Sequence, residues 1–158
     1  MAPEPNPGNP RRRYHSPARA DRAARTRRAV LAAAHDLFVA RGYAATGIRA
    51  VADAAGVSVA TVEQAFGTKR TLLKQVVDVT RAGDDLPVPL LARAPARAAE
   101  AAGSAEEFLA AVVAEVGVVA ERSSGIHRVL ADAAAADPEI AALAAEIDAQ
   151  RRVVAAWV

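Results

Sequence analysis

The sequence predicts an all-α protein in which a compact set of short helices is followed by a longer helical region. Hydrophobic residues make up 53% of the 158 residues, yet only 4% are aromatic and much of the remainder is alanine. Alanine favours helix and fills little volume, so we expect helices around a thinly filled core. Apolar residues recur at helical spacing through most of the chain after residue 20.

The stretch from Gly47 to Leu73 has the pattern of a helix-turn-helix. Gly56 interrupts the first apolar pattern and is free to adopt the positive φ found just past a helix end. Ser58 is placed to cap a second helix and Thr68 a third. Two short helices joined by such a turn form a helix-turn-helix. The residues expected to face inward are Ile48, Val51, Ala52, Ala55, Val62 and Phe66.

A helix is predicted before this motif, from Asp21 to Arg41. Asp21 is a suitable N-cap, and Gly42 is suited to the position just past the end. Thr46 can cap the first helix of the motif, and Tyr43 is expected to pack beneath it. The apolar stripe of the predicted helix is Val30, Leu31, Ala34, Leu37 and Phe38.

The rear of the chain predicts a linker and then three helices. Prolines argue against a continuous helix in the linker, residues 84–103. Ser104 and Glu107 form a capping box, which opens a helix to about Arg122. Either Ser123 or Ser124 is expected to start the next helix. The linker prolines are Pro87, Pro89 and Pro95.

The last helix has a strong start signal in Asp137, Pro138 and Glu139, which supply a cap, a proline at the first helical position and an early acid. We divide the chain into an arm (residues 1–20), a helix-turn-helix domain with a connecting helix (21–83), the linker, and a helical regulatory region (104–158). The apolar stripe of the last helix is Ile140, Leu143, Ile147, Val154 and Val158.

The segment from about Arg25 to Val77 resembles the N-terminal domain of the TetR family of bacterial transcriptional regulators. A bare helix-turn-helix is a weak signal, but the flanking Leu-Phe…Gly-Tyr…Thr and Phe-x-x-Lys…Leu-Leu patterns strengthen it. The resemblance implies a DNA-binding regulator with a helical ligand-binding and dimerisation domain. The matching residues are Val30, Leu31, Ala34, Leu37, Phe38, Gly42, Tyr43, Thr46, Val51, Ala52, Ala55, Gly56, Val57, Ser58, Thr61, Val62, Phe66, Lys69, Leu72 and Leu73.

The outward face of the second motif helix is expected to enter the DNA major groove. Arg49 and Gln64, with Thr61 and Ala60, are expected to reach base edges. Glu63 departs from the aromatic residues common at its place in the family; it could accept a hydrogen bond from cytosine, pair with Lys69, or repel phosphate. The face consists of Val59, Ala60, Thr61, Glu63 and Gln64.

Phosphate contacts are expected at helix starts, where free amides and the helix dipole attract anions. Lys69 and Arg70 reinforce one such start, although they could be ordinary surface cations. Ser58 lies at another, and the resemblance implies that Thr46 contacts a phosphate.

Charge is distributed unevenly along the chain. Residues 1–28 hold eight Arg and two acidic residues, whereas residues 82–158 hold six basic and twelve acidic residues. A basic front suggests that this end meets a polyanion. Arg11, Arg12 and Arg13 could form an arm along DNA, or a solubilising tail that touches nothing.

Enzyme chemistry has little support in the sequence. The three histidines, His15, His35 and His127, are scattered, and no catalytic motif or phosphate-binding loop is present. No cofactor or metal site is expected. The absence of Cys and of a long apolar segment agrees with a cytoplasmic protein without a membrane span.

Two functional hypotheses follow. The first is a ligand-responsive repressor that reads a palindromic operator on double-stranded DNA as a homodimer and binds a small apolar effector at unassigned residues. The second is a helical protein-interaction module, or an inactive remnant, without specific DNA binding. The chain stops at Val158 without a capping signal, so we expect a truncated regulatory region. Its last helix should then expose its stripe, and the chain should be a weak dimer or a soluble aggregator.

Overall fold

The computed structural model describes residues 17–156, which are almost entirely helical, and no strand occurs among them. The predicted all-α fold is therefore confirmed. The elements in order are α1 (Pro17–Ala45), α2 (Ile48–Ala55), α3 (Val59–Phe66), α4 (Lys69–Ala82), a 3-10 turn η1 (Leu90–Ala92), α5 (Ala94–Glu100), α6 (Ala105–Ala134) and α7 (Pro138–Ala155). None of these helices is long and apolar enough to cross a membrane.

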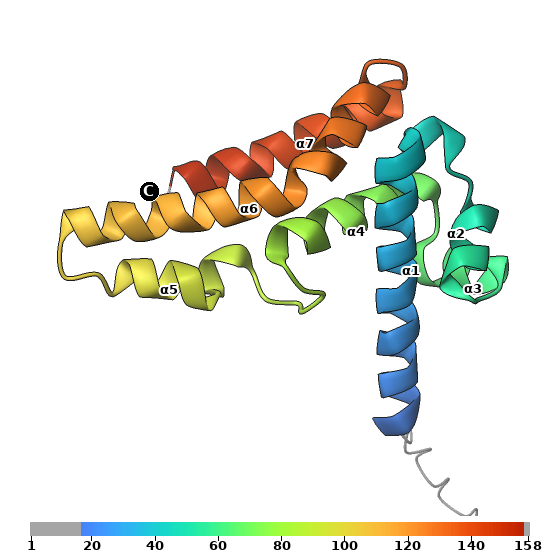
Figure 1. The fold of residues 1–158 in the computed structure, drawn as a ribbon, viewed down its shortest axis with the longest axis horizontal. Helices are drawn as coiled ribbons and strands as arrows, with labels where there is room; N and C mark the ends of the chain where they lie inside the picture. Colours follow the sequence, from blue (N-terminus) through green and yellow to red (C-terminus); the bar gives the residue numbers. More distant parts are fainter. Residues whose placement is uncertain (1–16, 157–158) are drawn as a thin grey trace, which may run out of the picture.

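The molecule has two parts, which are joined by α4 and by direct packing of α1 against α6 (Figure 1). We call α1, α2 and α3 the head, and η1, α5, α6 and α7 the body. Helices α2 and α3 pack beside the C-terminal half of α1, while α6 and α7 run side by side and α5 lies along the far end of α6. Helix α4 packs against both α1 and α6, so it connects the two parts directly.

Helix α1 begins earlier than expected. Its first residue is Pro17, so Asp21 lies inside the helix and the prediction that it is the N-cap was wrong. Proline suits a first turn because that turn has no use for its missing N–H. Gly42 does end the regular helix, with φ 78°, and a short turn to Ala45 follows. Tyr43 in that turn packs on Phe38, with ring centroids 5.8 Å apart.

The helix-turn-helix forms as the sequence predicts. Gly56 adopts a left-handed conformation, with φ 66°, and the Val57 N–H donates to Ala52 O at 3.0 Å. Ser58 caps α3 by accepting from the Thr61 N–H at 3.1 Å, and Thr68 caps α4 in the same way. The apolar faces of these helices and of α1 form the core of the head. Its buried residues are Val30, Leu31, Ala34, Phe38, Val51, Ala52, Val62 and Phe66.

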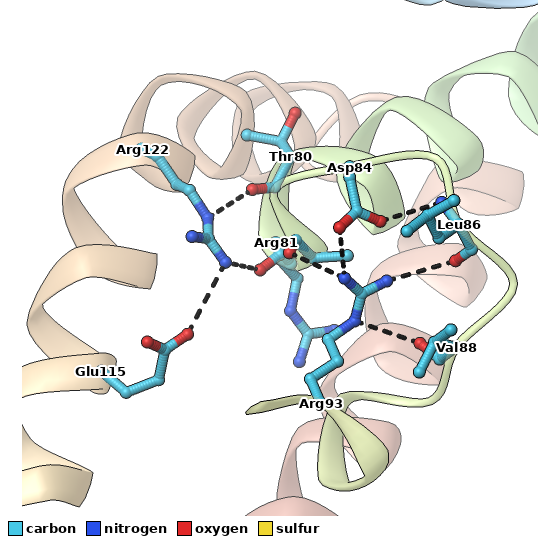
Figure 2. Close-up of polar contacts among 9 residues, drawn as sticks. Thr80, Arg81, Asp84, Leu86, Val88, Arg93, Glu115 and Arg122 are labelled. Atoms are coloured by element: carbon cyan, nitrogen blue, oxygen red, sulfur yellow. Dashed lines mark hydrogen bonds and ion pairs between the residues drawn. The ribbon is translucent and has the colours of Figure 1, made fainter. Parts of the chain in front are cut away.

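The predicted linker contains an additional helix, α5. Pro95 does not block a helix but lies in the first turn of α5, where proline is tolerated. The loop before α5 is held by Arg93, which is only 13% exposed. Its guanidinium contacts Asp84 at 2.6 Å and donates to Val88 O and Leu86 O at 3.1 and 3.2 Å (Figure 2).

Helix α6 is continuous, so the predicted break near Arg122 was wrong. Ser123 donates to Val119 O at 2.6 Å and Ser124 to Glu121 O at 3.2 Å. Both hydroxyls therefore bond back to carbonyls of the preceding turn, as serine within a helix does, and neither caps a new helix. At the start of α6, Ser104 caps as predicted by accepting from the Glu107 N–H, but the Glu107 carboxylate accepts from the Gly103 N–H.

Helix α7 begins at the predicted signal, with the Asp137 carboxylate accepting from the N–H groups of Glu139 and Ile140. The expected exposure of its stripe was wrong for Ile140, Leu143 and Ile147, which are buried at 2% exposure or less. Because α7 packs against α6 and α4, the stripe has partners within the chain. The Val154 side chain and Val158 lie outside the described part of the structure.

Candidate DNA interface and body cavity

One face of α3 is open to solvent, on the side of the head away from the body (Figure 1). Ala60, Glu63 and Gln64 are exposed, as predicted for a DNA-reading face. Val59 and Thr61 are partly buried, and Val59 packs against the core. The Thr61 hydroxyl lies 2.8 Å from the Ser58 hydroxyl, so both are engaged in the start of the helix. The exposed polar contact group on this face is therefore smaller than the sequence pattern suggested.

Arg49 lies in the first turn of α2 and is exposed. Its guanidinium makes no hydrogen bond or ion pair with residues 17–156, so it is available to a ligand outside the chain. Glu63 likewise forms no ion pair with these residues, and the suggested pairing with Lys69 is not present. The acidic group on the α3 face is therefore uncompensated.

Lys69 and Arg70 have partners within the protein. Lys69 Nζ donates to Tyr43 O at 3.0 Å and lies 4.2 Å from the centroid of the Tyr43 ring. Arg70 donates to Glu139 O at 3.2 Å, and its guanidinium is 3.9 Å from the Glu146 carboxylate. Lys69 thus fastens α4 to the end of α1, and Arg70 fastens α4 to α7. Their predicted phosphate contacts stay predictions.

Thr46 does not cap α2, contrary to expectation. Gly47 occupies the N-cap position and makes no side-chain cap. Thr46 is 1% exposed, and its hydroxyl donates to Gly42 O at 2.8 Å, with Leu37 O 3.1 Å away. The hydroxyl closes the turn after α1, because the carbonyls at that helix end need donors. Its implied phosphate contact would require this pairing to be shared or broken.

Residues 30–76 match the family model described as "Bacterial regulatory proteins, tetR family". This segment is a TetR-family N-terminal helix-turn-helix domain. It begins in α1 and ends in α4, so it covers the head core and the exposed face of α3. No curated protein matches the chain. The match places this segment in a family of DNA-binding transcriptional regulators. The predicted arm, with Arg11, Arg12 and Arg13, lies outside the described residues.

The body contains a cavity of about 620 Å³ between α4, α5 and α6. Periodicity did not reveal it, because the same small apolar residues would fit a packed core. The proline-rich linker and the alanines of α5 were the available signals: short side chains leave the space between α5 and α6 unfilled. The lining includes Arg81, Leu90, Leu91, Arg93, Pro95, Ala96, Ala99, Val112, Glu115, Val116, Val119, Ser123, His127 and Arg151.

Two polar side chains of this cavity have perturbed ionisation. Burial lowers the pKa of Arg81, and the nearby charge of Arg151 lowers it further. Burial also lowers the pKa of His127, partly offset by the contact of its Nδ1 with Ser123 O at 2.9 Å. No three His, Asp or Glu side chains among residues 17–156 lie close enough together to hold a metal ion.

Proposed function

We propose that the protein is a ligand-responsive repressor that binds a palindromic operator as a dimer. The observation that carries this proposal is the exposed face of α3 on a well-packed TetR-family head. A helix of this length reads few base pairs, so specificity requires two copies on two half-sites. The effector would occupy the body cavity, whose volume is in the range of ligand sites, about 300–1,000 Å³.

Base reading in this proposal rests on Arg49 and Gln64. Both are exposed, on helices that are anchored by buried Val51 and Val62. Arginine and glutamine form bidentate hydrogen bonds with guanine and adenine in the major groove. A rigid support is needed, since such contacts discriminate only when the side chains approach the bases in a fixed register. In this proposal the Glu63 carboxylate accepts a hydrogen bond from cytosine, or it lies too far from the DNA phosphates to repel them.

Helix α4 offers a direct route from effector to DNA. Its first residue, Lys69, is bonded to the head, while Arg81 near its other end lines the cavity. Arg122 of α6 donates to the carbonyls of Thr80 and Arg81 (Figure 2). A ligand that displaces α6 or α5 would therefore move α4 and the attached head. In a dimer this movement changes the distance between the two reading helices.

A second route joins the same parts. Arg27 of α1 lies over the ring of Phe66 at the end of α3, 5.0 Å from its centroid. The same guanidinium contacts Asp85, in the loop after α4, at 2.8 Å. Arg27 thus links α1, α3 and the loop that leads into the cavity wall.

The decisive experiment selects binding sites from a random pool of duplex DNA and measures affinity against salt concentration. We expect a palindromic site bound by two copies, with strong salt dependence. Replacing Arg49 or Gln64 by Ala should cost about 1–3 kcal/mol on the selected site and less on random DNA. Arg128→Ala, on the exposed surface of α6, is the matched control and should change neither affinity.

Equal losses on selected and random DNA would show that Arg49 and Gln64 position the protein without reading bases. If no DNA is bound with salt dependence, the regulator proposal fails and the protein-interaction module is favoured. Analytical ultracentrifugation at micromolar concentration tests the dimer. A monomer that binds a palindrome with nanomolar affinity would contradict the dimeric arrangement.

A further inference from the structure

The body cavity has an unpaired cation in its wall. Arg81 is 8% exposed, yet its guanidinium makes no hydrogen bond or ion pair with any residue from 17 to 156. In Figure 2 its side chain extends between Arg93 and Arg122 without a partner, although both of these neighbours have several. A buried charge without a partner is costly. An anion bound beside Arg81 would therefore be stabilised by its charge.

The nearby carboxylates are already engaged elsewhere. Glu115 lines the cavity but is directed to Arg122, 3.9 Å away. Asp84 contacts Arg93 at 2.6 Å, and Asp78 contacts Lys74 at 3.0 Å. The charge of Arg81 is therefore not neutralised by contact within the described chain.

His127, which also lines the cavity, carries a second polar group without a partner. Its Nδ1 lies 2.9 Å from Ser123 O, which leaves Nε2 buried without a hydrogen-bond partner. Arg151 of α7 also lines the cavity and interacts electrostatically with both Arg81 and His127. Three nitrogen-bearing side chains from α4, α6 and α7 thus gather in one region of the wall.

The remaining wall is mostly apolar. The η1 turn and α5 contribute aliphatic side chains on one side, and α6 contributes valines on the other. These residues have no polar atoms with which to orient a ligand. They are Leu90, Leu91, Pro95, Ala96, Ala99, Val112, Val116 and Val119.

We propose that this cavity binds an amphiphilic monoanion, with its carboxylate on Arg81 and its aliphatic chain along η1, α5 and α6. The inference rests on the effector site proposed above and names its ligand class, in place of the purely apolar molecule expected from the sequence. An arginine fork binds the two oxygens of a carboxylate in a fixed plane. The bound anion would replace the missing partner of Arg81.

Isothermal titration of the full chain with three matched probes tests the assignment. The probes are decanoate, 1-decanol and decyltrimethylammonium, which carry an anionic, neutral and cationic head, each below its micelle concentration. We expect decanoate to bind at least about tenfold more tightly than decanol, as for hydrogen bonds to a charged group. The cation should bind most weakly.

Variants of Arg81 test whether the carboxylate of decanoate binds at this residue. Arg81→Met keeps the side-chain length and removes the charge, and should weaken decanoate binding by about tenfold or more while changing decanol binding less than about threefold. Arg81→Lys should retain a preference for decanoate. Arg128→Met, the same change on an exposed face of α6, should leave all three affinities unchanged. Circular dichroism of each variant verifies that it is folded.

The proposal is overturned if decanol equals decanoate in the unsubstituted chain, if Arg81→Met keeps full decanoate affinity, or if none of the probes binds. Should Arg81→Met fail to fold, the probe preference of the unsubstituted chain and of Arg81→Lys decides the question. The operator assay is separate. Operator binding without decanoate binding leaves the DNA-binding function standing, whereas decanoate binding without operator binding refutes the regulator and retains the ligand class.

Discussion

The head and the far part of the body are both built from helices but are packed very differently. In the head, α1, α2 and α3 bury a continuous core that includes Phe38, Val62 and Phe66. In the stretch from residue 90 to residue 122, only Ala99 is fully buried. Leu109, Val113 and Val116 of α6 are more than half exposed.

The difference follows from side-chain volume and from the number of elements that meet. Phe38, Val62 and Phe66 fill the space between the crossing helices of the head, where α2 packs against both α1 and α3. Near α5, small alanines face valines of α6 and leave the cavity between these helices unfilled. The head is suited to holding side chains in a fixed register, and the far body is suited to opening around a ligand. Regions with few buried apolar contacts open locally at lower free energy.

The largest expected effect tests this contrast directly. Phe38→Ala should destabilise the protein by about 3–5 kcal/mol, because it leaves a cavity in a packed core. Val113→Ala, at 70% exposure, should change stability by less than about 0.5 kcal/mol. Denaturant unfolding of both variants measures the difference. A similar cost at the two positions would show that the far body is as tightly packed as the head.

Substitution of Arg93 tests which contacts hold the loop between α4 and α5, which forms part of the cavity wall. Arg93→Met removes the contacts of the guanidinium with Asp84, Leu86 and Val88. Hydrogen exchange of the amides of residues 84–93 should accelerate by about tenfold, while the amides of α1 should be unaffected.

The same variant changes the ionisation of Asp84. The hydrogen bond from Arg93 is the main cause of the lowered pKa of this carboxyl. In Arg93→Met the pKa should rise toward 3.8, its ordinary value, and nuclear magnetic resonance titration can follow it. An unchanged pKa together with unchanged exchange would show that the loop is held by other contacts.

The variant Lys69→Ala tests whether Lys69 only joins α4 to Tyr43 or also contacts DNA. If Lys69 also reaches a phosphate, Lys69→Ala should weaken binding to all DNA sequences and reduce the salt slope by about one unit. Lys74→Ala is the control, because Lys74 pairs with Asp78 and Glu146 on the body side. If the slope is unchanged while the unfolding midpoint falls, Lys69 serves only to join α4 to Tyr43.

The smallest effect concerns pH. The pKa of His127 is lowered in the folded chain, mainly by burial. The unfolded state therefore binds a proton more readily, and the stability held above about pH 6.5 should decline as the pH falls from 6.5 through the lowered folded pKa. His127→Leu should flatten this decline in thermal unfolding, and His35→Leu, in the head, serves as the control. An identical pH dependence in all three proteins would show that burial of His127 does not contribute.

The sequence by itself determined the helix-turn-helix of the head and the starts of α3, α4, α6 and α7. Positive φ at Gly42 and Gly56, and caps at Ser58, Thr68 and Asp137, are local choices that depend on a few neighbouring residues. The family pattern across residues 30–76 includes the same local signals together with buried core residues such as Val51 and Val62. These features could therefore be read before any tertiary contact was known.

Tertiary structure alone decided the continuity of α6, the burial of the α7 stripe and the shape of the cavity. Serine can cap a helix or bond back within one, and the packing of α6 along both α4 and α7 selected the second at Ser123. The pairing of Lys69 with Tyr43 and the isolation of Arg81 depend on residues far apart in the chain. Charged side chains are long and have many possible partners, so only the assembled helices determine which of them are paired and which are left without a partner.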